Sequence, residues 1–244
     1  PIDPFYGDYY YQYPAIIEGI RQTAAAHGFD GEYWATEISY CSEEFPQCHA
    51  SDQPWGLPRT GKQAAKYSSR ALVMHLGMDM GVAMGAIRYD NPEIAPWSQR
   101  SISNLYKVLA GTRPISLAVR IESEPTNTLT NTFVLPNGDM LFALWTHGEA
   151  VDDDPGVSTT LTFPGLYARQ VIAIDALNGF EKELIIEVEN GDLVIRKIFV
   201  MDYPIILRIV STTTTTTTTT TPSWSVLLLL LTLFAMIPLR SRKK

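Results

Sequence analysis

The sequence predicts an α/β region, then an all-β region, and then a membrane-anchored tail. Three observations support this fold class. Helical and strand-like segments alternate in residues 1–113, and the apolar period changes from 3.6 to 2 in residues 114–210. The chain closes with a threonine tract, an apolar run and a basic cluster. Alternation of helices and strands is typical of α/β folds, whereas a series of short strands is typical of all-β folds.

The first 113 residues read as βα units. Apolar spacing predicts helices over Tyr13–His27 and Lys62–Met80, and a third helix that ends at Gly111. Short apolar runs predict buried strands at Glu32–Ile38 and Val82–Ile87. Strands that read as continuous apolar runs between helices indicate a parallel sheet covered on both faces.

Residues 114–210 predict an antiparallel β-sandwich. Seven segments alternate between apolar and polar residues, and they are separated by turn signals. Three Asn-Gly pairs, at Asn137, Asn178 and Asn190, are strong signals for tight hairpin turns. Because the linker between the helical region and the sandwich is short, we expect the sandwich to pack against the helical region. The segments are Ile115–Glu122, Met140–Trp145, Val157–Phe163, Arg169–Asp175, Leu184–Val188, Leu193–Phe199 and Ile205–Ile209.

The C-terminal tail predicts a tether. Residues 211–223 include ten consecutive threonines and form a disordered linker, because such a tract buries no apolar area. Residues 224–239 predict one transmembrane or sorting helix, and a buried core helix is the alternative interpretation. The basic residues 240–244 are expected to stay in the cytoplasm, which places residues 1–211 outside it, anchored to the membrane or cell surface. The arrangement resembles the sorting signals of sortase and archaeosortase substrates, with Pro222 to Trp224 at the motif position.

Charge and cysteine content restrict the function further. Four of the 19 Lys and Arg residues lie in 240–244, so the rest of the chain sets 15 basic against 26 acidic residues, a net charge of −11. This acidic balance argues against nucleic-acid binding. Cys41 and Cys48 predict a disulfide of an exported protein. A metal site with His49 is the weaker alternative, because a C-x2-C spacing is absent.

Glu37 is the candidate catalytic residue. It lies at the carboxyl end of the first predicted strand. Parallel barrels place their catalytic groups at this end, because the strand bodies are filled by packed side chains. A structural ion pair is the alternative role for a carboxylate at a strand end.

Four segments together resemble a known enzyme family. YWATEISY (33–40), GVAMGAIRYD (81–90), LAGTRP (109–114) and VMDYPIILRI (200–209) resemble the end of retaining clan A glycoside hydrolases of the xylosidase and iduronidase type. The resemblance implies that residues 1–113 are the last βα units of a (β/α)8 barrel and that Glu37 is the nucleophile. It places the acid/base carboxylate before Pro1, so the chain is expected to be a truncated fragment that is inactive alone. It implies no metal and no organic cofactor.

Residues near the same strand ends are candidates for carbohydrate binding. Because sugar rings stack on aromatic side chains, aromatic residues near these strand ends are candidates for binding substrate. Ordinary packing is their alternative role. Arg88 and Asp90 either bind sugar hydroxyls or pair with each other. A second hypothesis for the whole chain is a non-catalytic glycan-binding or structural surface module. The sequence signals neither a particular sugar nor an oligomeric state. The aromatic candidates are Tyr6, Tyr40, Trp55, Tyr89 and Trp97.

Overall fold

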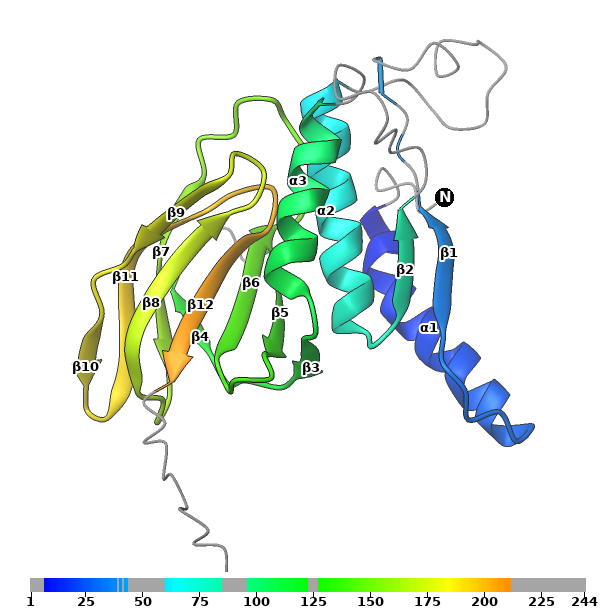
Figure 1. The fold of residues 1–244 in the computed structure, drawn as a ribbon, viewed down its shortest axis with the longest axis horizontal. Coiled ribbons are helices and arrows are strands. Elements are labelled where there is room, and N and C mark those ends of the chain that lie inside the picture. Colours follow the sequence, from blue (N-terminus) through cyan, green and yellow to red (C-terminus); the bar gives the residue numbers. More distant parts are fainter. Residues whose placement is uncertain are drawn as a thin grey trace, which may run out of the picture. The chain divides into compact units, whose positions relative to one another are not determined.

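The computed structural model divides the chain into two compact units, Pro1–Thr212 and Thr213–Lys244. Every described residue belongs to the first unit, and these residues contain three helices and twelve strands (Figure 1). The described residues are 7–38, 40, 42–43, 60–84, 96–122 and 127–211.

The helices are punctuated by local sequence. Thr60 begins α2 with a capping box: its hydroxyl accepts from the Gln63 amide at 3.1 Å, and the Gln63 side chain accepts from the Thr60 amide at 3.3 Å. At the other end of α2, Arg21 of α1 donates to the carbonyls of Met78 and Asp79, at 2.5 and 3.0 Å. A cation on these carbonyls complements the helix dipole. The helices are α1 (Gly7–Ala26), α2 (Gly61–Gly77) and α3 (Pro96–Leu109).

Two antiparallel sheets account for most of the described residues. The six-stranded sheet has the order β3-β5-β6-β12-β8-β9, and the four-stranded sheet has the order β10-β11-β7-β4. The strands of the first are β3 (Arg113–Ile115), β5 (Thr128–Val134), β6 (Met140–Thr146), β8 (Ala168–Asp175), β9 (Phe180–Glu183) and β12 (Ile205–Ser211). Those of the second are β4 (Arg120–Glu122), β7 (Val157–Phe163), β10 (Glu187–Glu189) and β11 (Asp192–Val200).

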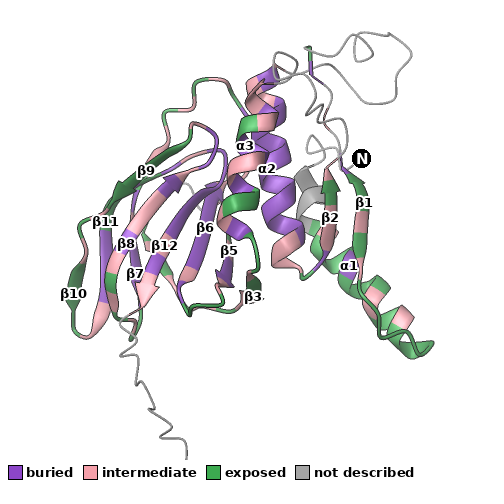
Figure 2. Ribbon diagram, viewed as in Figure 1, coloured by how far each residue is buried: buried purple, intermediate pink, exposed green. Residues whose placement is uncertain are grey.

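The six-stranded sheet is covered on both faces. On one face, Phe142 and Leu144 of β6 join a core shared with the four-stranded sheet. On the other face, Leu141, Ala143 and Trp145 of the same strand join a core shared with α2 and α3. Alternate side chains of a strand point to opposite faces, so a strand buried on both faces must be apolar at every position. This explains the continuous apolar run of β6 and the burial of its central residues (Figure 2).

The two remaining strands form a separate, exposed sheet. β1 (Trp34–Ile38) pairs in parallel with β2 (Gly81–Met84), and these two strands form a sheet of their own. Four of the five residues of β1 are not buried, and Trp34 is 60% exposed. On α1, Ile16 and Ile20 are also exposed (Figure 2). Parallel sheets are normally buried on both faces, and this pair departs from that rule.

The predicted fold class is therefore wrong. The described residues are mostly β-sheet with three helices, and no part of a (β/α)8 barrel is shown among them. The runs at 32–38 and 82–87 were expected as buried strands, but what the structure describes of them is one exposed pair. No helix within the described ranges is long and apolar enough to cross a membrane. The predicted linker, 211–223, begins at the last residue of β12, and the rest of it and the predicted transmembrane segment, 224–239, lie outside these ranges.

A buried histidine joins α1 to α2. His75 is fully buried, its Nδ1 lies 2.7 Å from the Ala71 carbonyl, and its Nε2 lies 2.9 Å from the Tyr13 hydroxyl. Burial lowers the pKa of His75 below 6.5, although the hydrogen bond to Ala71 acts in the opposite direction. Burial and the nearby Arg70 likewise lower the pKa of His147. The folded chain therefore disfavours the protonated form of both imidazoles.

Stability is expected to fall as the pH falls below about 6.5, the ordinary pKa of histidine in the unfolded chain. Below this pH these histidines bind protons more readily in the unfolded state than in the folded state, so a lower pH favours unfolding. Urea unfolding between about pH 7.5 and about pH 5.5 measures the slope, and His75→Gln is expected to flatten it. An unchanged slope in His75→Gln would show that this histidine does not contribute.

Candidate active site

Glu37 lies in an irregular part of the parallel pair. The register pairs Trp34 with Gly81 and Ala35 with Val82, and it shifts before Ile38 pairs with Met84. Glu37 falls within this shift, next to the last residue of β1. Such irregularities re-aim a side chain, and they are over-represented beside active sites. Glu37 is therefore not part of a regular ladder between the two strands.

The Glu37 carboxylate is open to solvent. Its residue is exposed, whereas the next residue, Ile38, is 6% exposed and anchors the strand end. Within the described part of the chain, Glu37 forms no hydrogen bond and no ion pair. A structural ion pair, the alternative role considered for it, is therefore not formed by the residues that the structure describes.

Tyr40 connects the end of this strand to α2. Its ring stacks on that of Tyr67, with centroids 5.5 Å apart and an interplanar angle of 24°. Tyr67 is 3% exposed, and its hydroxyl accepts from the Ala150 amide at 2.9 Å. Ala150 belongs to the loop after β6 (residues 147–156). The segment beyond Glu37 thus contacts Tyr67 of α2, and the loop after β6 holds Tyr67 through the Ala150 amide.

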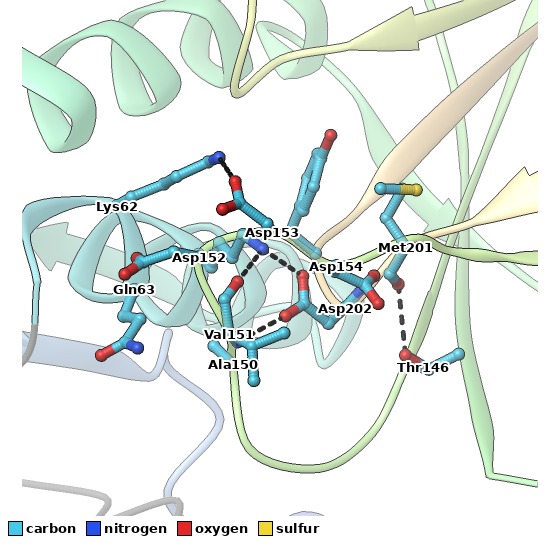
Figure 3. A network of polar contacts seen from close by, with 12 residues as sticks. Lys62, Gln63, Thr146, Ala150, Val151, Asp152, Asp153, Asp154, Met201 and Asp202 are labelled. Atoms are coloured by element: carbon cyan, nitrogen blue, oxygen red, sulfur yellow. Dashed lines mark hydrogen bonds and ion pairs between the residues drawn. The ribbon is translucent and has the colours of Figure 1, made fainter.

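Buried charges fix the same loop (Figure 3). The Lys66 ammonium lies 2.7 Å from the Asp202 carboxylate, and the side chains are 1% and 7% exposed. Lys66 also donates to the Val151 carbonyl, and the Val151 amide donates to Asp202 at 2.8 Å. Arg70, one turn further along α2, donates to the carbonyls of Asp202 and Gly148, both at 2.6 Å. Two cations of one helix therefore hold both ends of Gly148–Val151.

Three further polar contacts, one exposed and two part-buried, surround this buried group. Lys62 lies 3.3 Å from Asp153, whose side chain is 98% exposed. The Thr60 hydroxyl donates to Asp152, and Asp154 accepts from the Asp202 amide at 2.6 Å. The three consecutive aspartates thus each have a partner. In the described ranges, no group of three or more His, Cys, Asp or Glu is placed to hold a metal ion.

Trp97 is half-buried and lies near two cations. The Lys62 ammonium and the Arg100 guanidinium lie 5.5 and 5.4 Å from its ring centroid. The ring also packs against the core between the two antiparallel sheets. These contacts give Trp97 a packing role. Its role in binding substrate, like that of Tyr40, stays a prediction.

The other predicted site residues lie outside the described ranges, so the structure does not show whether they approach Glu37 or whether the cysteines pair. These are Tyr6, Trp55, Arg88, Tyr89 and Asp90 for substrate binding, and Cys41 and Cys48 for the disulfide.

A cavity of about 670 Å³ opens at the opposite end of the parallel pair. It is lined by residues that precede or begin the two strands, among them Tyr33 and Gly81, and by Phe133 of β5. Arg21, on its wall, is already engaged by the end of α2 and lies 5.2 Å from the Tyr33 ring. The cavity does not include Glu37.

Sequence reasoning missed Lys66, Tyr67, Arg70 and Asp202 as parts of this region. One signal was present: Lys66 and Arg70 are spaced four apart within an alanine-rich helix segment, so they share a face with buried residues. The partner carboxylate lies more than 130 residues later, and no local pattern connects it to them.

Comparison with known proteins gives a distant structural likeness. The chain matches no protein family profile and no curated protein. Among solved structures, the catalytic domain of GH30 xylanase C from Talaromyces cellulolyticus is similar to this chain, with a TM-score of 0.45 and 11% sequence identity. The similarity covers 75% of this chain and 42% of the xylanase domain. The chain thus spans about two fifths of that domain, and its structure is distantly similar to that of a glycoside hydrolase.

Proposed function

We propose that this chain carries the nucleophile of a retaining glycoside hydrolase and that Glu37 is this nucleophile. The observation that carries the proposal is the state of Glu37: an exposed carboxylate beside the end of a parallel strand, without an ion-pair partner among the described residues. An ion pair with a cation lowers the nucleophilicity of a carboxylate oxygen and fixes its orientation, whereas an unpaired carboxylate can attack an anomeric carbon. The resemblance of residues 33–40 to a nucleophile-bearing strand supports the same role.

The proposed reaction is a double displacement. The Glu37 oxygen attacks the anomeric carbon, the bond to the leaving oxygen breaks, and a second carboxylic acid gives its proton to that oxygen. Water then attacks the glycosyl ester, loses a proton to the second carboxylate, and releases Glu37. The two carboxyl groups of such enzymes lie about 5 to 5.5 Å apart. We propose that polypeptide outside these 244 residues supplies the second group, so the chain alone is expected to show no turnover.

The proposal is tested by trapping the glycosyl ester. The complete encoded polypeptide is incubated with a panel of 2-deoxy-2-fluoro glycosides that carry a dinitrophenolate leaving group. The fluorine slows both displacements, while the activated leaving group departs without acid assistance, so the ester accumulates. We expect the mass of one fluorosugar on the peptide that contains Glu37. Peptide mapping by mass spectrometry locates the label.

Two variants make this test specific. Glu37→Gln is expected to abolish the label. Glu32→Gln is the matched control, because Glu32 is an exposed glutamate five residues earlier whose carboxylate accepts from the Trp34 indole at 3.2 Å. The control is expected to label normally. Label on a different carboxylate, or a folded protein that neither hydrolyses nor labels with any glycoside of the panel, would contradict the proposal. The second result would favour a non-catalytic glycan-binding module.

We further propose that the protein works outside the cytoplasm, tethered by its C-terminus. The support is the order of the tail: a threonine spacer, the charge-free segment 224–239 and the basic residues 240–244. The disulfide between Cys41 and Cys48 belongs to this proposal, because disulfides persist in oxidising compartments.

A further inference from the structure

Tyr67 connects two parts of the chain that are far apart in sequence. On one side its ring stacks on Tyr40, three residues after Glu37. On the other side its hydroxyl accepts from the Ala150 amide at 2.9 Å, 83 residues later in the chain. A phenol that is 3% exposed has few alternative orientations, because neighbouring atoms occupy the space around it.

The Ala150 amide is a fixed donor. It lies in the short segment Gly148–Val151, whose two ends are held by Arg70 and by the pair of Lys66 and Asp202. The Arg70 guanidinium also lies 5.0 Å from the centroid of the Tyr67 ring. Tyr67 is therefore held at its hydroxyl and at its ring by groups that are themselves buried and paired.

Within β1 itself, the residues up to Glu37 are weakly packed. β1 pairs with β2 along one edge, its residues up to Glu37 are not buried, and its register is irregular between Ala35 and Ile38. Burial of Ile38 and Ser42 and the stack of Tyr40 on Tyr67 hold the described residues around Glu37, and Tyr40, Ser42 and Glu43 have further interactions. A weakly packed strand depends on contacts made by the residues that follow it, and the stack of Tyr40 on Tyr67 is one of these contacts.

We infer that Tyr67 is a positioning residue for Glu37: through its stack with Tyr40 and its hydrogen bond to Ala150, it transmits the rigidity of the buried charge cluster to the segment that carries the nucleophile. This inference rests on the proposed function of Glu37. Nucleophilic attack is sensitive to placement, and an error of about 1 Å in a reacting group can cost about 100-fold in rate. The loop after β6 thereby acts on the nucleophile indirectly, through Tyr67.

The first test removes only the hydroxyl. Tyr67→Phe keeps the ring and its stack but leaves the Ala150 amide without its acceptor. In the complete polypeptide we expect kcat, and the rate of trapping by the 2-fluoro glycoside, to fall about 3- to 10-fold, with KM within about twofold of the parent value. Tyr67→Leu also removes the stack, so we expect kcat and the trapping rate to fall further than in Tyr67→Phe. The difference between the two variants then measures the contribution of the ring.

The matched control is Tyr203→Phe. Tyr203 is also a buried tyrosine, 4% exposed; its hydroxyl donates to Asp175 at 2.9 Å and accepts from the Asn178 side-chain amide at 3.1 Å, so the substitution removes at least as much hydrogen bonding. It does not contact Tyr40 in any interaction of the described residues. We expect this variant to lose stability but to keep kcat. An equal loss of kcat in Tyr203→Phe and Tyr67→Phe would overturn the inference, because the effect would then be general loosening.

A second readout does not depend on catalysis. Amide hydrogen exchange of peptides that cover residues 34–43 is expected to quicken in Tyr67→Phe and to stay unchanged in Tyr203→Phe. Unchanged exchange in Tyr67→Phe would overturn the inference even if Glu37 is the nucleophile. A third outcome separates the two claims. If the trap does not label Glu37 but hydrogen exchange of residues 34–43 quickens in Tyr67→Phe, the proposed function is wrong and Tyr67 still restrains this segment.

Discussion

Replacing Glu37 by glycine is expected to lower kcat/KM of the complete polypeptide about 10³-fold or more. The substitution removes the group proposed to form the covalent intermediate, and water in the vacated space is a poor nucleophile without a correctly placed base. The loss corresponds to a transition-state destabilisation of about 4 kcal/mol or more. Steady-state hydrolysis of an aryl glycoside measures it.

Folding is expected to survive this change. Glu37 is exposed and contributes no hydrogen bond or ion pair to the described structure, so the unfolding midpoint of Glu37→Gly should remain near that of the parent. Glu32→Gln should retain activity. If Glu37→Gly retained more than about a tenth of the parental kcat/KM, Glu37 would not be the nucleophile.

Asp202→Ala is expected to destabilise the chain by about 3 to 5 kcal/mol. The substitution leaves the Lys66 ammonium, which is 1% exposed, without a carboxylate, and it removes the acceptor of the Val151 amide. The cost arises from a buried charge that loses its partner, which exceeds the net contribution of the intact pair. Equilibrium unfolding in urea measures the difference.

Asp153→Ala is the control for Asp202→Ala. Asp153 also pairs with a lysine of α2, but its side chain is 98% exposed, so the loss should leave the unfolding midpoint nearly unchanged. Adding Lys66→Met to Asp202→Ala is expected to recover part of the stability, because no uncompensated charge then remains. Equal effects of Asp202→Ala and Asp153→Ala would contradict the role assigned to the buried pair.

Local sequence patterns located many of the strands and turns. The expected strand Met140–Trp145 corresponds to β6, and the Asn190-Gly191 turn joins β10 to β11 with φ of 53° and 87° at its two residues. Positive φ at both positions is what makes Asn-Gly a hairpin signal. These features depend on a few neighbouring residues, so a single sequence contains the information that determines them.

Other elements were missed or divided because the deciding contacts are not local. β5 was not predicted, since Asn131 occupies the centre of its sequence; in the structure this side chain lies against Gly77 of α2, where a Cβ would overlap it. The single strand expected over Ile115–Glu122 is two strands, β3 and β4, which belong to different sheets. Alternation alone does not show that a chain crosses from one sheet to another.

The barrel prediction failed for a related reason. Two apolar runs between helices indicate parallel pairing, and β1 and β2 do pair in parallel. Apolar runs do not specify how many further strands join, or what covers them. For the candidate site, the sequence predicts Glu37 from its place at the end of a strand, and that role stays a prediction. It did not identify the residues that hold the neighbouring segment, because Tyr67 and Ala150 are 83 residues apart.

The most direct test of the central claim is chemical rescue of Glu37→Gly in the complete polypeptide with sodium azide. If Glu37 is the nucleophile, azide enters the vacated space, attacks the anomeric carbon of an activated glycoside and restores turnover. Nuclear magnetic resonance of the product should then show a glycosyl azide whose anomeric configuration is inverted relative to the substrate. A folded Glu37→Gly protein that azide does not reactivate, or that gives a glycosyl azide of retained configuration, would contradict the assignment of Glu37 as the nucleophile.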